Sequence, residues 1–264
     1  MFVHSFDATP IACTASGSGP ALLLVHGSGG SSAQFAALRP LLEADFTVVT
    51  MDRRGHGASG DSASYTLAAE AADIAAVLAA IESAHVLAHS YGAVCALEAA
   101  RRGAAMRGLL LYEPPIVTRP GAYFPAELLA DMRKAVAAGD GEAALLAFAR
   151  VVRGATAEQM VQMRRMPGWP ERCAHALVLL RELEAVADYH LDAPAFADWA
   201  MPTLILRGSD SAADYVATAD ALLACLPGSR LGFLAGQRHG AIEAAPALVT
   251  AALREFVADQ KLAG

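Results

Sequence analysis

Short, continuously apolar runs alternate along the chain with longer runs that have the spacing of helices. Apolar runs of five or six residues that are closed by Gly, Asp or Pro are typical of strands in a parallel sheet covered on both faces. The predicted strands are 21–26, 46–51, 84–88, 108–112 and 203–207, with a last candidate at 230–234. The predicted helices between and after them are 34–42, 66–81, 93–102, 213–225 and 246–259. This alternation predicts right-handed crossovers and a doubly wound, mostly parallel sheet of the α/β class.

The alternation stops after Glu113 and resumes at Met201. Prolines open the interrupted region, and no buried strand is predicted within it. Its helix-like runs are 125–138, 141–152, 157–165 and 170–187. The pattern therefore predicts a core made of 1–113 and 199–264, interrupted by a helical insertion at 114–198. Residues 2–6 and 11–15 are predicted to form an N-terminal hairpin.

Composition narrows the classes of function. The chain has 264 residues, is 55% hydrophobic and has a formal net charge of −7, which suits one large domain or a core with a subdomain. It has no basic patch, so nucleic acid is not an expected partner. Residues 1–10 lack the features of a signal peptide, and no run reaches the ~18 apolar residues of a membrane span. We therefore expect a cytoplasmic protein that contacts neither nucleic acid nor membrane.

The cysteines and histidines give no sign of a metal. Cys13, Cys95, Cys173 and Cys225 lie far apart, without Cys-x-x-Cys spacing. They are predicted to be buried free thiols in a reducing compartment. The histidines and carboxylates likewise lack the spacing of metal ligands, so no metal and no cofactor are expected.

The residues Leu87 to Gly92 read Leu-Ala-His-Ser-Tyr-Gly and join a predicted strand to a predicted helix. A serine at such a sharp turn is typical of a nucleophile elbow, which needs small residues two positions to either side. Gly92 meets this need, whereas Ala88 stands where the usual pattern has glycine. The alternative is that Ser90 is only the N-cap of the following helix, a position that serine favours.

Further motifs follow the predicted strands in order. They are 26–30 (His-Gly-Ser-Gly-Gly), 52–59 (Asp-Arg-Arg-Gly-His-Gly-Ala-Ser), 206–210 (Leu-Arg-Gly-Ser-Asp) and 236–239 (Gly-Gln-Arg-His), with the Ser90 turn between the second and the third. Over essentially its whole length the chain thereby resembles the α/β-hydrolase family. The resemblance implies the α/β-hydrolase fold with an inserted helical cap.

The resemblance also implies a catalytic triad in the order nucleophile, acid, histidine. It maps onto Ser90, Asp210 and His239. Serine needs a base that takes its proton, imidazole titrates near neutrality, and a carboxylate holds one imidazole tautomer. Glu113 follows an earlier strand, where some relatives place the acid, and it remains the alternative to Asp210.

Two backbone N–H groups are expected to stabilise an oxyanion. The N–H of Tyr91 lies at a helix N-terminus, where the helix dipole adds positive potential. The resemblance places the second donor at Ser28, with Gly29 as the alternative.

The other histidines and charged residues near these motifs are predicted to be structural. His26 and His89 satisfy hydrogen bonds of the loops, His56 belongs to a turn, and His85 opens a strand. Asp52 and Arg54 brace the loop beside the His-Gly turn.

The site predicts an acyl-bond hydrolase. Family members that open epoxides or displace halide use aspartate at the elbow, so Ser90 favours an ester, lactone, thioester or amide-like bond. A small, fairly apolar substrate is expected. The alternatives are a carbon–carbon bond hydrolase, a cofactor-free perhydrolase or haloperoxidase, and a non-catalytic ligand-binding member. The sequence does not fix the oligomeric state, and a homodimer is one of the states that it allows. Candidate pocket residues are Gly29, Phe124, Met160, Met163, Met166 and Trp169.

Overall fold

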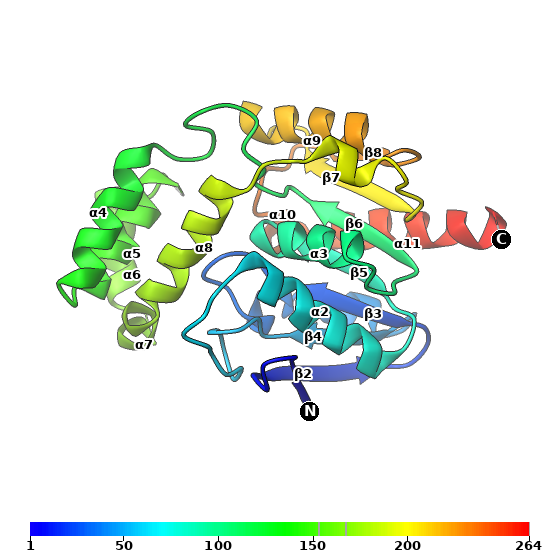
Figure 1. Ribbon diagram of the computed structural model, residues 1–264, viewed down its shortest axis with the longest axis horizontal. Helices are drawn as coiled ribbons and strands as arrows, with labels where there is room; N and C mark the ends of the chain where they lie inside the picture. Colours follow the sequence, from blue (N-terminus) through cyan, green and yellow to red (C-terminus); the bar gives the residue numbers. More distant parts are fainter. Residues whose placement is uncertain (153, 167, 264) are drawn as a thin grey trace. The chain divides into compact units, whose positions relative to one another are not determined.

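The computed structural model describes residues 1–152, 154–166 and 168–263. The chain divides into two compact units. One consists of Met1–Ile116 together with the chain from Leu191 onward, and the other is Val117–His190. Figure 1 shows the first as a layered α/β structure and the second as a group of helices.

The first unit contains every described strand. Its elements are β1 (Phe2–His4), β2 (Pro10–Gly17), β3 (Ala21–Val25), η1 (Ser32–Phe35), α1 (Arg39–Leu42), β4 (Thr47–Met51), α2 (Leu67–Ile81), β5 (His85–His89), α3 (Tyr91–Arg101), β6 (Gly108–Tyr112), η2 (Ala193–Phe196), β7 (Thr203–Gly208), α9 (Ala213–Cys225), β8 (Arg230–Leu234), α10 (Ala241–Ala244) and α11 (Pro246–Ala263).

The strands form one sheet in the order β1-β2-β4-β3-β5-β6-β7-β8. β1 and β2 pair antiparallel, as do β2 and β4, whereas the pairs from β4 to β8 are parallel. The register sets His89 beside Tyr112, and Tyr112 beside Leu206. The prediction of a doubly wound, mostly parallel sheet is therefore confirmed, and the carboxyl ends of β3, β5, β6 and β7 meet at one edge.

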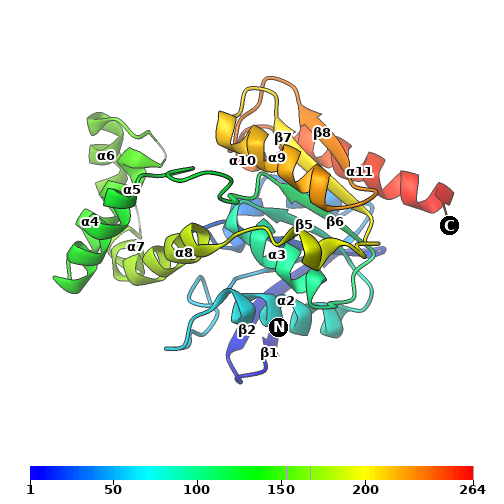
Figure 2. The same cartoon turned by 45° about the horizontal axis from the view of Figure 1, so that its top comes forward.

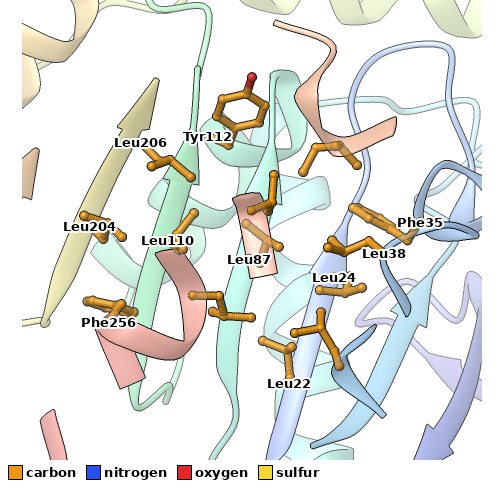
Figure 3. Close-up of a cluster of buried hydrophobic side chains, with 14 of the residues drawn as sticks. Leu22, Leu24, Phe35, Leu38, Leu87, Leu110, Tyr112, Leu204, Leu206 and Phe256 are labelled. Atoms are coloured by element: carbon orange, nitrogen blue, oxygen red, sulfur yellow. The ribbon is translucent and has the colours of Figure 1, made fainter. Parts of the chain in front are cut away.

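One face of the sheet carries a core of alternate side chains (Figure 3). Successive residues of a strand point to opposite faces, so Leu22 and Leu24 of β3 share a face with Leu87 of β5. Helices η1, α1, α10 and α11 contribute the opposing apolar side chains, while α2 and α3 pack together on the other face (Figure 2). At the top of this cluster Tyr112 keeps its ring in the core and its hydroxyl at the edge where the parallel strands end (Figure 3).

The described part of the second unit consists of helices and the loops that join them, without a strand. It contains α4 (Ala126–Ala137), α5 (Gly141–Val151), α6 (Ala157–Arg164), α7 (Trp169–Ala174) and α8 (Ala176–Asp188). Asp140 caps α5 by accepting a hydrogen bond from the N–H of Ala143, and Thr156 forms a capping box with Gln159 at the start of α6. In the described part of the chain no helix has the length and apolarity that crossing a membrane requires.

Two predicted helices are each divided in two. The helix predicted at 34–42 is the 3₁₀ helix η1 followed by the short α1, because Pro40 lacks the N–H that a continuous helix would donate to residue 36. The helix predicted at 170–187 is α7 and α8, which meet at His175, whose φ of −93° and ψ of 13° lie outside the helical region.

Buried ion pairs fix the loop after β4 that was predicted to be structural. Arg54 forms a bidentate ion pair with Asp73 of α2, with both N–O distances at 2.7 Å. The carboxylate of Asp52 accepts N–H bonds from Ser32 and Ala58. Fully buried charges are tolerated only when they are paired, so this loop is held between α2 and the η1 segment.

Gly92 gives a test of the packing between β3 and α3. A Cβ on this residue would collide with the carbonyl oxygen of His26 and lie 2.9 Å from that of Val25. We expect Gly92→Ala to destabilise the fold by about 1–3 kcal/mol, as overpacking typically does. Denaturant unfolding would measure the loss.

The matched control is Gly240→Ala, because a Cβ there meets nothing within 4 Å. Equal stability of Gly92→Ala and the wild type would show that the packing between β3 and α3 leaves room for a methyl group at residue 92.

Candidate active site

Ser90 lies in a strained turn between β5 and α3. Its φ of 56° and ψ of −130° are unfavourable for a residue with a side chain. The turn is anchored at both sides, since the N–H of Ser90 donates to the carbonyl of Tyr112 at 2.9 Å and the N–H of Ala93 donates to the carbonyl of Ser90 at 2.8 Å. This backbone is the elbow that the sequence predicted.

Close backbone packing explains the small residues around this turn. A Cβ on Gly27 would lie 2.9 Å from the Cβ of Ser90, so the turn after β3 approaches the serine directly. Ala88 is fully buried and pairs with Val25 and Leu111 in the sheet. The sheet therefore accommodates the methyl group that stands in place of the usual elbow glycine.

His239 lies between Ser90 and a buried carboxylate. Its Nε2 is 3.0 Å from Oγ of Ser90, and its Nδ1 is 2.8 Å from Oε2 of Glu113. Because an ionised carboxylate only accepts hydrogen bonds, Nδ1 carries the proton, and in the neutral ring Nε2 is left to accept the serine proton. These three side chains have the geometry of a nucleophile, a base and an orienting acid.

The carboxylate beside His239 is that of Glu113, the alternative that the sequence left open, and not that of Asp210. Glu113 follows β6 with a φ of 49° and has a fully buried side chain. Its other oxygen, Oε1, accepts hydrogen bonds from the N–H of Gly208, at 2.8 Å, and from the hydroxyl of Ser211. The end of β7 therefore donates to Glu113 instead of supplying the acid.

Asp210 is exposed and lies in the turn after β7. Its Oδ1 accepts a hydrogen bond from the hydroxyl of Ser209 at 2.8 Å, and its N–H donates to the carbonyl of Gln237. The signal for Glu113 was present in the sequence, as a carboxylate directly after a buried strand. Its contact with His239, which distinguishes it from Asp210, was not.

Tyrosine side chains hold the imidazole and the loop that carries it. The ring of Tyr215, in the first turn of α9, stacks on His239 with centroids 4.5 Å apart and an interplanar angle of 16°. The hydroxyl of Tyr112 donates to the carbonyl of Arg238. Burial, followed by the charge of Glu113, raises the pKa of the Tyr112 phenol well above its ordinary value, so the hydroxyl keeps the proton that it donates.

The predicted oxyanion donors lie on the two segments that flank Ser90. Tyr91 is the first residue of α3, and the N–H groups of a helix's first turn have no intrahelical acceptor. Ser28 lies in a turn closed by the N–H of Gly30 and the carbonyl of Gly27, 3.2 Å apart, and Gly29 takes the positive φ of 60° that this turn requires. The roles of Ser28, Tyr91 and Gly29 stay predictions.

A buried arginine fixes the carbonyls that lead into this turn. The guanidinium of Arg53 donates to the carbonyls of His26 and Gly27 and forms a 2.7 Å ion pair with Glu70. The hydroxyl of Tyr65 donates to the same carboxylate and lies 2.8 Å from the hydroxyl of Tyr91. The turn with Ser28 and the start of α3 are thus tied to one polar network.

The remaining predicted pocket residues do not share one hollow. Met163 and Met166 line a hollow of about 500 Å³ beside α6, whereas Phe124 lines a separate one of about 380 Å³. Trp169 is buried, and its indole N–H donates to Glu142 at 2.9 Å. Gly29 belongs to the other compact unit. Trp169 thus packs within the helical unit, and the substrate roles of all these residues stay predictions.

Two of the other histidines are bound to loop backbone, as the sequence reasoning expected. Nε2 of His26 accepts a hydrogen bond from the N–H of Arg53, and Nδ1 lies 2.8 Å from the carbonyl of Gly27. Nε2 of His89 lies 2.9 Å from the carbonyl of His239. Within the described residues, no group of three or more His, Cys, Asp or Glu side chains could hold a metal ion.

Comparison with known proteins agrees with this fold. A model of the alpha/beta hydrolase family matches residues 22–253. An alpha/beta hydrolase of Sphaerobacter thermophilus has 33% sequence identity and a TM-score of 0.85, with 97% of this chain and 100% of that chain covered. An esterase from Rhodococcus shares the fold, with a TM-score of 0.70 at 24% identity and coverage of 98% of each chain.

Curated relatives match over shorter segments. An N-formylmaleamate deformylase of Pseudomonas putida is 36% identical over 117 residues, which are 42% of this chain and 44% of that protein. A fluoroacetate dehalogenase of Burkholderia is 38% identical over 90 residues, 31% of this chain and 30% of that protein. The matches thus span less than half of either relative's length.

The two candidate acids can be separated by the reactivity of Ser90. Glu113→Gln removes the negative charge, and because the N–H of Gly208 still needs the side-chain oxygen, the amide NH₂ would face Nδ1 of His239 and favour the wrong tautomer. We expect it to slow phosphonylation of Ser90 by a fluorophosphonate about 10²- to 10⁴-fold. Asp210→Asn, the matched control, is expected to react within about twofold of the wild type, because its carboxylate contacts Ser209. Intact-mass spectrometry over time gives both rates. An equal loss in Asp210→Asn would contradict the assignment.

Proposed function

Because this chain belongs to the alpha/beta hydrolase family, we propose that it is an enzyme, a serine hydrolase that cleaves an acyl bond of the ester type. The observation that carries the proposal is the continuous hydrogen-bonded chain from Ser90 through His239 to Glu113. A serine hydroxyl is a weak nucleophile unless a base stands within hydrogen-bond distance. His239 would be that base, and the carboxylate of Glu113 would orient it.

The first half of the proposed reaction forms an acyl-enzyme. Oγ of Ser90 attacks the carbonyl carbon of the substrate while Nε2 of His239 takes the hydroxyl proton, and Glu113 stabilises the resulting imidazolium. The carbonyl oxygen becomes an oxyanion. When this intermediate collapses, the bond to the leaving group breaks, and Nε2 returns the proton to that group.

The second half regenerates the serine. Water attacks the acyl carbon with His239 again as the base, and collapse of the second oxyanion releases the carboxylic acid and restores the hydroxyl of Ser90. Both oxyanions would be stabilised by the N–H of Tyr91 and by that of Ser28. A single donor of this kind contributes about 3–4 kcal/mol to transition-state stability.

The nucleophile and the relatives together suggest the bond that is cleaved. Family members that displace halide use an aspartate at the elbow, so the Ser90 hydroxyl supports acyl transfer over dehalogenation. The esterase from Rhodococcus and the deformylase from Pseudomonas putida are named for ester and N-formyl chemistry. We propose a small, uncharged ester or lactone as the substrate, and an N-formyl amide as a second class of substrate.

The helical unit Val117–His190 is proposed to select the substrate as a cap. It is inserted shortly after Glu113, and its described surface is hollowed beside apolar side chains such as Phe124 and Met163. Methionine lines adaptable apolar sites well. A substrate of modest size and low charge agrees with these linings.

Turnover of small esters tests the proposed function. We expect the wild type to hydrolyse short-chain p-nitrophenyl esters or small lactones, and Ser90→Ala to lower kcat about 10³-fold or more, since the nucleophile is removed. The panel would include an N-formyl amide. Both proteins should unfold at similar temperatures.

Hydrolysis by Ser90→Ala within about threefold of the wild type would refute the assignment of the nucleophile. Ligand binding without turnover of any acyl substrate, unchanged in Ser90→Ala, would indicate a binding protein instead.

A further inference from the structure

His89 lies between the two loops that the proposed reaction brings together. It is the last residue of β5, directly before Ser90, and its side chain is buried. One nitrogen of the His89 ring contacts the loop that carries His239. The other nitrogen lies beside the segment that contacts the turn with Ser28, which we call the oxyanion turn. The proposed catalytic steps do not use this residue.

The contact with the His239 loop defines where a proton lies. Nε2 of His89 is 2.9 Å from the carbonyl oxygen of His239. A carbonyl only accepts hydrogen bonds, so Nε2 of His89 carries a proton and donates it. A nitrogen committed in this way cannot take the proton of Ser90, and this rules out His89 Nε2 as a rival base.

The other side of the ring leads to the turn that holds Ser28. Nδ1 of His89 lies 3.3 Å from Oε1 of Gln34 in η1. The same amide oxygen accepts the N–H of Gly27 at 3.2 Å. An amide oxygen only accepts hydrogen bonds, so Nδ1 of His89 donates to it only when both ring nitrogens carry protons, and in the neutral ring protonated on Nε2 the two atoms are in contact without a hydrogen bond. Gln34 thus binds the backbone of the oxyanion turn, and His89 packs against Gln34 while it binds the backbone of the base.

Ring packing restricts the orientation of His89. It stacks on Tyr112 with centroids 5.2 Å apart, and its centroid lies 4.6 Å from that of His239. Tyr112 in turn donates to the carbonyl of Arg238, next to the residue that His89 contacts. The last residues of β5 and β6 therefore hold the same short loop by adjacent hydrogen bonds.

We propose that His89 is a positioning residue that holds His239 and the oxyanion turn at fixed positions relative to Ser90. The inference rests on the proposed function, because the relative position of a base and the oxyanion donors matters only where an oxyanion forms. Displacement of a catalytic group by about 1 Å can cost about 10²-fold in rate. Loss of the contact is therefore expected to act on kcat more than on KM.

Three substitutions separate the contributions of the residue. His89→Phe keeps a flat ring against Tyr112 but has no N–H for the carbonyl of His239. His89→Gln keeps a donor without the ring. Gln34→Met removes the link to Gly27. We expect His89→Phe to lower kcat about 10- to 100-fold with KM changed less than about threefold, and His89→Gln to recover part of that loss.

The coupling of the two loops predicts non-additivity. If His89 acts partly through Gln34, the double variant His89→Phe, Gln34→Met should lose less in kcat than the product of the two single losses. The matched control is His85→Phe. His85 opens the same strand, is equally buried at 5% exposure, and lies against Phe256. It should change the unfolding temperature about as much as His89→Phe and leave kcat within about twofold of the wild type.

A measurement that needs no turnover completes the test. Long-range ¹H–¹⁵N spectra of the full chain, labelled with ¹⁵N-histidine and assigned with His89→Gln, report which ring nitrogens carry protons. A proton on Nε2 of His89 supports the inference, and a neutral ring protonated on Nδ1 alone overturns it. A kcat of His89→Phe that matches that of His85→Phe also overturns it. Failure of Ser90→Ala to reduce turnover would instead remove the proposed function, while the spectra still judge the contact.

Discussion

The turn at Ser90 is the constraint on which the rest of the site depends. The strand β5 must reverse into α3 within one residue, and the serine takes a φ of 56° to do so. Such a conformation survives only where the surroundings enforce it. Here Gly27 and Gly92 allow two backbone segments to approach closely, and the carbonyl of Tyr112 binds the serine N–H.

That turn makes the carboxyl edge of the parallel sheet into a chemical site. The ends of β5 and β6 supply Ser90 and Glu113, and the loop after β8 brings His239 between them. Glu113 is itself held in a positive-φ conformation by contacts from the end of β7. Neighbouring strand ends thus fix Ser90 and Glu113, and the proposed function follows from the imidazole that bridges them.

The alternation of apolar and helical runs was enough to predict the order of strands and helices, because fully buried parallel strands have an unmistakable composition. The turn at Ser90 and the place of His239 after the last parallel strand were expected from the resemblance to the family, and the structure brings the two side chains within 3.0 Å, while their catalytic roles stay predictions. The acid could not be decided. Glu113 and Asp210 both follow strands that end at one edge. The contact of Glu113 with Nδ1 of His239 and the contact of Asp210 with Ser209 separate them, and neither contact is visible in the sequence.

Apolar spacing does not by itself distinguish substrate residues from core residues, because the same spacing produces cores and pockets. Trp169 packs inside the helical unit, and its indole N–H is bound by Glu142. By contrast, the division of the predicted helix at 34–42 had a readable cause in Pro40. Local backbone chemistry is thus visible in a sequence, whereas the destination of an apolar side chain depends on contacts between distant segments.

The central claim is that Ser90 forms a covalent acyl intermediate. Its most direct test is rapid acid quenching of the enzyme during turnover of an activated ester, followed by intact-mass and peptide mass spectrometry. The account predicts a transient mass increase equal to the acyl group, located on the peptide that contains Ser90. Turnover without any adduct, or an adduct located on another residue, would contradict it.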